Sequence, residues 1–290
     1  MSKLMKKSLI AGAVALAFSG SVFAQATISS GSTTVKLDSS GNIDSGTIGS
    51  PGLSYLGTEY INWGSPSSFY WLTTGAPAGS FLAHYGSDPI GGVTTGAGPT
   101  AATTFGTGGL FVSMLHVLTL PNQYSNTVSL TNTGGAAITG VQFSVGFDPD
   151  QGIIGPDGVG TYVTTNTITG VGGAASVRAH AAGYPDVTLA NTTSAGAFTV
   201  AGYIAPGCCG AWTAATALGG AQGLGYTSVG DQDIVLGYNL GMVGAGQTIS
   251  FGYSYTFANP VPEPETYAML LAGLGLMGFV ARRRKLKAVA

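Results

Sequence analysis

Residues 248–257 read Thr-Ile-Ser-Phe-Gly-Tyr-Ser-Tyr-Thr-Phe. From Phe251 to Phe257 an aromatic side chain occupies every second position, and glycine or a hydroxyl-bearing residue stands between. Because successive side chains of a β-strand point to opposite faces, this alternation predicts a strand with its aromatic side chains on one face. Asp233–Leu240 precedes it across a glycine-rich turn. We expect these two stretches to pair as a hairpin.

The same kind of pattern recurs along the chain. Thr127–Thr131 and Ile138–Val145 flank the turn sequence Asn-Thr-Gly-Gly and predict another hairpin. Phe111–Leu120 and Gly160–Thr169 are further strand candidates. No stretch of good helix formers with helical periodicity occurs between these strands. The fold class we expect is therefore all-β, with an antiparallel β-sandwich body.

Composition indicates that this body is folded. The chain has 44% apolar residues and only 8% charged residues, whereas disordered chains combine low hydrophobicity with high net charge. Residues 25–259 can form one large β domain or two smaller ones. The segment at residues 91–109 is rich in glycine, threonine and alanine, and is the candidate for a long loop or an internal domain boundary.

The charge of the body excludes one class of partner. Between Gln25 and Asn259 the basic residues are Lys36 and Arg178, against ten acidic residues, which gives a net charge of −8. Nucleic-acid binding depends on lysine and arginine side chains that neutralise phosphates. We therefore expect no nucleic-acid partner.

The N-terminus has the three parts of a secretory signal peptide. Lys3, Lys6 and Lys7 give it a positive start, and an apolar run follows. Val-Phe-Ala then forms a small-x-small site, with cleavage expected between Ala24 and Gln25. Residues 1–24 are thus predicted to be a signal helix that directs the chain through the Sec translocon.

The C-terminus, residues 260–290, has its own order. A stiff, extended Pro-Glu-Pro strip comes first, followed by an apolar run of about 15 residues, fewer than the roughly 20 that span a membrane. A basic cluster, which the positive-inside rule keeps in the cytoplasm, nearly ends the chain. The strip comprises Val261, Pro262, Glu263, Pro264 and Glu265, and the cluster begins with Arg282, Arg283, Arg284 and Lys285.

This tail resembles the PEP-CTERM sorting signal of Gram-negative bacteria. The resemblance implies a C-terminal transmembrane sorting helix that is read, and cleaved, by an exosortase-type membrane transpeptidase in organisms that secrete exopolysaccharide. It implies a tethered intermediate at the inner membrane, followed by the cell surface or the extracellular matrix. The resemblance predicts a destination and names no activity.

No catalytic motif was found in the body. A nucleophile elbow, a Walker loop and a His-Glu-x-x-His zinc motif are all missing from the sequence. The histidines are His84, His116 and His180, which lie far apart without metal-ligand spacing. We interpret His116, inside an apolar strand, as a hydrogen-bonded core or face residue. A metal or triad role for the other two stays open, because such partners meet in space.

One acidic turn is a candidate calcium site. Asp148, Asp150 and Asp157 lie close together among prolines and glycines, and hard Ca²⁺ takes carboxylate ligands. Their spacing departs from that of an EF-hand loop, so a solvated acidic turn is the competing interpretation.

Cys208 and Cys209 are adjacent and are the only cysteines of the chain. Export would place them in an oxidising compartment. A vicinal disulfide, a bridge between chains and two free thiols are the three alternatives. The flanking glycines and proline favour the vicinal disulfide, because they make a turn that could hold it.

Aromatic residues gather between Tyr55 and Trp71, where a sugar-binding platform competes with an ordinary β core. The function we predict is that of a non-catalytic cell-envelope or matrix protein, associated with exopolysaccharide. A carbohydrate-binding or ice-binding module is the first alternative, and a secreted hydrolase is the second. Thr165, Thr167 and Thr169 would make one row of an ice-binding array, and the sequence reveals no second row.

Overall fold

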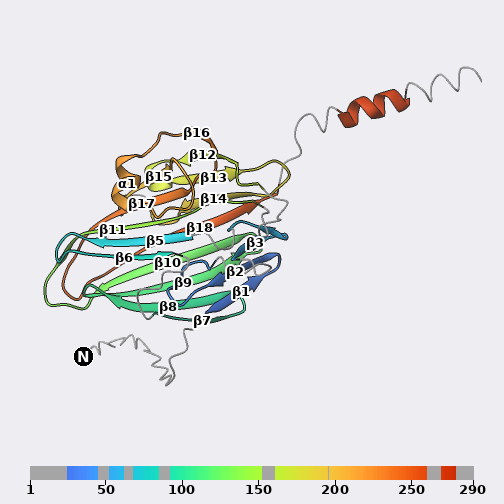
Figure 1. Ribbon diagram of the computed structural model, residues 1–290. Helices are drawn as coiled ribbons and strands as arrows, with labels where there is room; N and C mark the ends of the chain where they lie inside the picture. The colour runs from blue at the N-terminus through green and yellow to red at the C-terminus, as the bar shows by residue number, and fades with distance from the viewer. Residues whose placement is uncertain are drawn as a thin grey trace, which may run out of the picture.

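The computed structural model describes residues 25–44, 52–61, 68–84, 92–151, 161–194, 196–259 and 269–278. The described strands form three sheets of nine, five and four strands, and their pairings are antiparallel (Figure 1). A mostly β body built from antiparallel sheets is thereby confirmed. The predicted signal peptide, residues 1–24, lies outside the described residues.

The nine-stranded sheet has the strand order β16-β12-β13-β14-β18-β10-β9-β8-β7. Its strands are β7 (Val93–Ala97), β8 (Thr100–Thr107), β9 (Leu110–Leu120), β10 (Gln123–Asn132), β12 (Thr164–Gly170), β13 (Ser176–His180), β14 (Asp186–Asn191), β16 (Thr227–Gly230) and β18 (Thr248–Ala258). A short 3-10 turn, η1 (Gly172–Ala174), links β12 to β13. Buried and accessible side chains alternate along β9 and β10, so one face of this sheet is turned to the core.

The five-stranded sheet has the order β15-β17-β11-β5-β6, and the four-stranded sheet the order β1-β2-β3-β4. The five strands are β5 (Ser68–Thr74), β6 (Gly79–His84), β11 (Ile138–Phe147), β15 (Thr199–Ile204) and β17 (Ile234–Val243). The four strands are β1 (Ala26–Ser30), β2 (Thr33–Leu37), β3 (Leu53–Tyr55) and β4 (Thr58–Glu59).

Aromatic side chains fill the space between the nine- and five-stranded sheets. The ring of Phe143, on β11, lies 4.9 Å from that of Phe251 on β18, and Tyr238 on β17 lies at the same distance from Phe251. The four-stranded sheet joins the same core, because Tyr55 stacks on Phe257 at 5.2 Å. All four aromatic residues from Phe251 to Phe257 are buried, as their alternation predicted.

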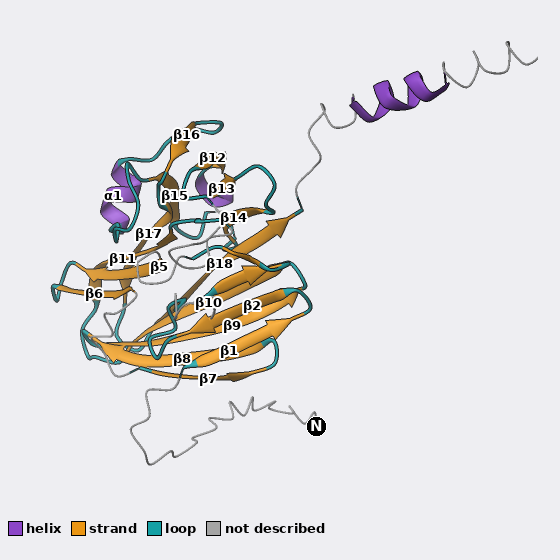
Figure 2. Cartoon of the chain, turned by 45° about the vertical axis from the view of Figure 1, so that its right-hand side comes forward, coloured by secondary structure: helices purple, strands orange, loops and turns teal. Residues whose placement is uncertain are grey.

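The two predicted hairpins are wrong. β10 lies in the nine-stranded sheet, whereas β11, the next strand along the chain, lies in the five-stranded sheet. β17 and β18 are separated in the same way (Figure 2). Each connection is therefore an arch between layers. The arches stack, because β10 pairs with β18 and β11 pairs with β17.

Asn132 ties the two arches together. Its side-chain amide donates to the carbonyl of Val243 at 2.9 Å, and its backbone N–H donates to the carbonyl of Gln247 at 2.9 Å. The sequence Asn-Thr-Gly-Gly was expected to close a tight turn within one sheet. Instead, the aromatic faces of the strands on either side are buried against each other, which requires them to lie in opposite layers.

The interpretation of residues 91–109 as a long loop is also wrong for the part that the structure describes. Residues 93–97 and 100–107 form β7 and β8, and β8 pairs with β9 along its length. Threonine favours strands because its branched side chain packs well on a pleated surface. In this segment that preference outweighs the tendency of the glycines to disfavour a strand.

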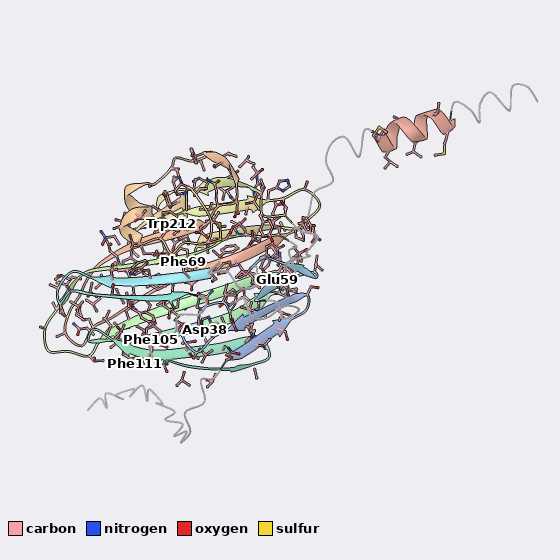
Figure 3. All side chains as sticks on the ribbon, viewed as in Figure 1. Asp38, Glu59, Phe69, Phe105, Phe111 and Trp212 are labelled. Carbon is pink, nitrogen blue, oxygen red and sulfur yellow. A yellow bond between two sulfur atoms is a disulfide. The ribbon has the colours of Figure 1, made fainter. Side chains whose placement is uncertain are left out.

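One helix covers the outer face of the five-stranded sheet. α1 (Ala214–Gly219) begins at Thr213, whose hydroxyl accepts a hydrogen bond from the backbone N–H of Thr216, a typical N-cap. Ala217 of this helix packs with Phe69 and Val235 in a second, small apolar cluster. Figure 3 shows Trp212 on the side of the body that carries α1.

Part of the apolar tail is described as a helix over residues 269–278 (Figure 1, red). Its apolar side chains are exposed, Met269 to 75% and Leu271 to 68%. Within the described residues, no helix has the length and apolar character that crossing a membrane requires.

Candidate functional site

Two Asp-x-Asp pairs meet at one end of the five-stranded sheet. Asp148 and Asp150 directly follow β11, and Asp231 and Asp233 directly precede β17. Phe147 pairs with Ile234 in the register of these antiparallel strands, so the end of β11 lies beside the start of β17. Carboxylate oxygens of Asp148, Asp150 and Asp231 lie within 4.8 Å of one another. We call this group the acidic cluster.

Two members of the acidic cluster, Asp148 and Asp150, were predicted from the sequence as calcium ligands, and the third was not. Asp157, the remaining residue of the predicted calcium site, lies outside the described residues. Asp231 was not predicted as a calcium ligand, although its spacing from Asp233 repeats that of Asp148 from Asp150. Asp231 could have been predicted from the sequence, because one Asp-x-Asp pair follows a predicted strand, the other precedes one, and the two strands could be neighbours.

The cluster is mostly buried. Asp148 and Asp150 are 1% and 2% exposed, whereas Asp231 is exposed to solvent. Burial, with the repulsion of neighbouring carboxylates, raises the pKa of Asp148 and of Asp150 above the ordinary value for aspartate. Burial also raises the pKa of Asp233 to about 7, although hydrogen bonds to its carboxylate act in the opposite direction.

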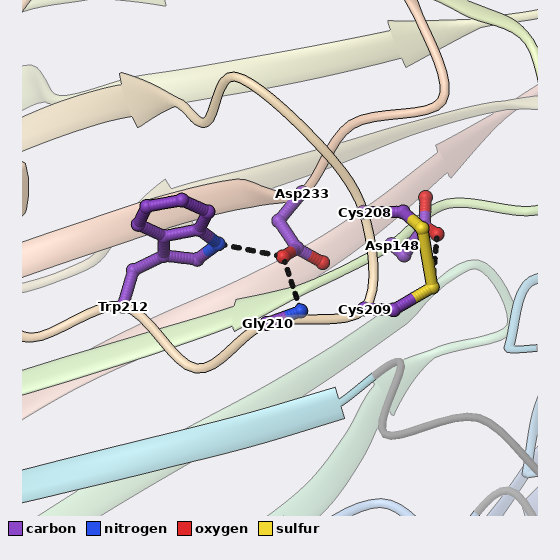
Figure 4. The surroundings of a disulfide bond; sticks show 6 residues. All are labelled: Asp148, Cys208, Cys209, Gly210, Trp212 and Asp233. Carbon is purple, nitrogen blue, oxygen red and sulfur yellow. Dashed lines mark hydrogen bonds between the residues drawn. A yellow bond between two sulfur atoms is a disulfide. The ribbon is translucent and has the colours of Figure 1, made fainter.

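A loop after β15 closes over this end of the sheet (Figure 4). Cys208 and Cys209 form a vicinal disulfide in it, and Cys209 Sγ lies 3.8 Å from Asp148 Oδ2. Further along the loop, the indole Nε1 of Trp212 donates to Asp233 Oδ2 at 2.7 Å, and the Gly210 N–H donates to the same oxygen at 3.2 Å. The loop therefore binds one oxygen of Asp233 and sets the disulfide beside Asp148.

His116 is a core residue, as predicted. Its Nδ1 lies 2.6 Å from Asn126 Oδ1 and 2.8 Å from the Tyr124 hydroxyl, and its Nε2 lies 3.1 Å from Thr103 Oγ1. Burial lowers the pKa of His116 to about 4, so the ring is neutral in ordinary buffers. These contacts link β8, β9 and β10 and leave the ring no access to a substrate.

His180 lies at the surface, where its Nδ1 is 2.6 Å from Asp186 Oδ1. Arg178 NH1 is 3.8 Å from the other oxygen of Asp186. The three side chains form a small polar group on β13 and β14. The side chain of His84, the remaining histidine, lies outside the described part of the chain.

The aromatic residues between Tyr55 and Trp71 belong mainly to the core. Tyr60 and Phe69 are fully buried, and Tyr70 is 2% exposed and stacks with Phe143 at 5.6 Å. These residues therefore form no sugar-binding platform, and the core interpretation holds for them. Trp63 lies outside the described residues.

The outer face of the nine-stranded sheet has an extended hydroxyl surface instead. Ser250, Ser129, Ser113 and Thr104 stand in register on four adjacent strands, β18, β10, β9 and β8. We call the accessible hydroxyl side chains here the hydroxyl face: Thr104, Ser113, Ser125, Thr127, Ser129, Thr131, Thr248 and Ser250. Strands in a sheet are about 4.8 Å apart, so the rows are closely spaced. These rows do not extend the row of Thr165, Thr167 and Thr169, because β12, which carries those threonines, pairs with β13 and β16 at the far end of the sheet.

Comparison with protein families matches the PEP-CTERM protein-sorting motif to residues 260–285. The described body is mostly β, with antiparallel sheets. The C-terminus of the chain carries the sorting motif. The motif implies an exported cell-surface protein that exosortase processes. Its strip from Val261 to Glu265 and its basic cluster from Arg282 to Lys285 lie outside the described residues, as does Ala24 of the signal-cleavage site.

Among solved structures, the chain is similar to a polysaccharide lyase, with 15% sequence identity and a TM-score of 0.37. The match covers 68% of this chain and 26% of the lyase, so the chain spans about a quarter of the lyase's length. Comparison with curated proteins finds no match.

Proposed function

We propose that this chain is a non-catalytic envelope or matrix protein that associates with exopolysaccharide around a Gram-negative bacterium. The observation that carries the proposal is the PEP-CTERM motif at residues 260–285, which gives the chain its destination. The signal peptide at residues 1–24 supplies the matching start, because it directs the chain to the Sec translocon.

The two ends act in sequence. The basic cluster resists translocation and leaves the chain tethered at the inner membrane, with the body outside. Cleavage near Pro262 then frees the body for the surface or matrix. The body is a β-sandwich with facing sheets of nine and five strands, and its core residues in the described part of the chain run from Ala26 to Phe257.

The chemistry of the body supports a role without catalysis. A hydrolase needs two carboxylates, or a nucleophile and a base, that converge where a substrate can reach them. In the described residues, the carboxylates that do converge are mostly buried, with Asp148 and Asp150 almost inaccessible. His116 is enclosed in the core.

Mass spectrometry of the mature protein tests the sorting route. In a host with its exosortase, the surface protein should yield peptides from Gln25 to Asn259 and none from Leu270 to Ala290. Deleting the exosortase should restore the tail in the membrane fraction. Replacing Pro262, Glu263 and Pro264 with alanine should have the same effect. Intact Ala290 on the surface form would contradict the route.

A second candidate function is sugar binding by the hydroxyl face. Ser129 and Ser250 lie 2.8 Å apart, as do Thr131 and Thr248, and each hydroxyl keeps capacity for further hydrogen bonds. Phe111, 45% exposed, stands opposite Thr131 and presents an apolar ring on the same face. An uncharged surface of this kind, with hydroxyls beside an apolar ring, suits a neutral polysaccharide chain.

Binding to the host's own exopolysaccharide tests this second candidate. Phe111→Ala and Ser129→Leu should each weaken binding several-fold, on the order of 1 kcal/mol per lost contact. Met242→Ala is the matched control, because it removes an exposed apolar side chain from β17 in the other sheet. Equal binding by all three variants and the wild type would exclude the hydroxyl face as the contact surface.

A further inference from the structure

Among the described residues, the acidic cluster lacks a positively charged partner. The body has only two residues with permanent positive charge, Lys36 and Arg178. Lys36 pairs with Asp44 at 3.0 Å, and Arg178 pairs with Asp186 at 3.8 Å. Buried charges in proteins are paired or coordinate metals, because an isolated buried charge is very costly. The cluster therefore needs protons or a metal cation to neutralise it.

Several oxygens at this end of the sheet also lack a hydrogen-bond donor. Asp148 Oδ1 and Asp150 Oδ1 are buried and have no partner among the described residues. Buried oxygens without donors are rare in native proteins and require an explanation such as an ion.

Asp233 provides a separate observation. It is fully buried, and it is not one of the three residues whose oxygens converge within 4.8 Å. The loop binds its Oδ2, whereas its Oδ1 has no partner in the described structure. Figure 4 shows that this free oxygen is turned to the side on which Asp148 and the disulfide lie. Its charge acts on Asp148 and on Asp150.

The spacing of the ligand oxygens fits one ion. Ca²⁺ binds oxygens at about 2.3–2.6 Å, so two ligands of the same ion lie at most about 5 Å apart. The oxygens of Asp148, Asp150 and Asp231 satisfy this limit, since all lie within 4.8 Å. The sulfurs of Cys208 and Cys209 are joined to each other and are not thiolates, so they do not supply the soft ligands that favour zinc or copper.

We propose that Asp148, Asp150 and Asp231 bind a calcium ion, with Asp233 beside them as a supporting carboxylate. Mg²⁺ fits less well, because it keeps most of its water and usually takes one or two carboxylates. Exposed Asp231 gives the ion its route from solvent. The ion joins the end of β11 to the start of β17 and neutralises the carboxylates under the disulfide loop.

Calcium titration of the exported protein tests this site. Calorimetry with CaCl₂ should show one site, and calcium at about 100 times its Kd should raise the melting temperature by about 5–10 °C relative to EGTA. Asp231→Asn should weaken binding by about 10-fold or more and remove about half of this shift or more at the same calcium concentration. The variant should fold, because Asp231 is exposed.

The matched control is Asp186→Asn, which removes an aspartate of a surface ion pair on β14. It should keep wild-type calcium affinity. Equal melting curves in CaCl₂ and EGTA, with no heat of binding, would overturn the proposal. Full affinity in Asp231→Asn, or an equal shift with MgCl₂ alone, would also overturn it.

Discussion

Glu59 is a buried carboxyl group held by backbone amides. Its Oε1 accepts hydrogen bonds from the N–H groups of Gly52, Leu53 and Ile61 at 3.0–3.2 Å, while its Oε2 is buried without a partner in the described structure. Burial raises the pKa of Glu59 to about 7, although the three amides act against this. The side chain therefore takes up a proton on folding between pH 4.5 and pH 7.

We predict that Glu59→Gln stabilises the protein at neutral pH. The folded pKa is raised, so the free energy of unfolding of the wild type falls as pH rises from 4.5 to about 7. Glutamine cannot ionise, so the variant should gain up to about 3 kcal/mol relative to wild type across this range. Urea unfolding of both proteins at pH 4.5, 6 and 8 checks it. A difference that does not change with pH would contradict the prediction.

The free energy of unfolding of Glu59→Gln must be compared with that of the wild type at each pH, because His116 also makes stability depend on pH. Its pKa is lowered to about 4, so its contribution to stability is complete above pH 6.5 and is lost as pH falls toward 4. This slope is opposite to that of Glu59 over most of the same range. The pH profile of the wild type alone is therefore flatter than either group would produce.

At the scale of elements, α1 depends on a glycine in the strand beneath it. A Cβ placed on Gly237, in β17, would lie 2.8 Å from the Cβ of Ala217 and 3.1 Å from the carbonyl oxygen of Ala214. The absence of a side chain lets the helix approach the outer face of the five-stranded sheet. Small residues on both sides of this contact set the distance between the helix and the strand.

We predict that Gly237→Ala destabilises the protein by about 2 kcal/mol through overpacking. This corresponds to a fall in melting temperature of about 4–8 °C. Adding Ala217→Gly should recover part of the loss, reduced by the cost of about 1 kcal/mol for glycine in a helix. Gly135→Ala is the control, since a Cβ there meets no atom within 4 Å. An unchanged melting temperature in Gly237→Ala would show that α1 can move away freely.

The two arches show that strands can be predicted correctly from the sequence while their pairing is predicted wrongly. The strand character of residues 248–257 was evident from the sequence, because buried aromatic residues alternate with small polar ones. The sequence also showed that a short connection precedes it. A short connection can close a hairpin or cross between layers, and the choice depends on what the aromatic face is buried against. Here Phe251 packs on Phe143 and Tyr238 of the opposite sheet.

At the scale of the whole molecule, the sorting motif and the described core occupy separate stretches of the chain. The core extends from Ala26 to Phe257, and the sorting motif occupies residues 260–285. The motif could be recognised from the sequence because its parts are contiguous. The motif is defined by the order of three segments along the chain: a stiff proline strip, a short apolar run and a basic cluster. These segments follow one another in the sequence, so no tertiary contact is needed to bring them together.

The sequence by itself determined the properties that depend on neighbouring residues: the C-terminal sorting motif, the strand periodicity and the adjacency of Cys208 and Cys209. Tertiary structure alone decided which strands share a sheet, and therefore which distant residues meet. Asp231 joins Asp148 because β17 pairs with β11, and Ser250 lines up with Ser113 because β10 lies between β18 and β9. The physical reason is that burial of the aromatic faces selects the pairing, and that burial involves the whole body at once.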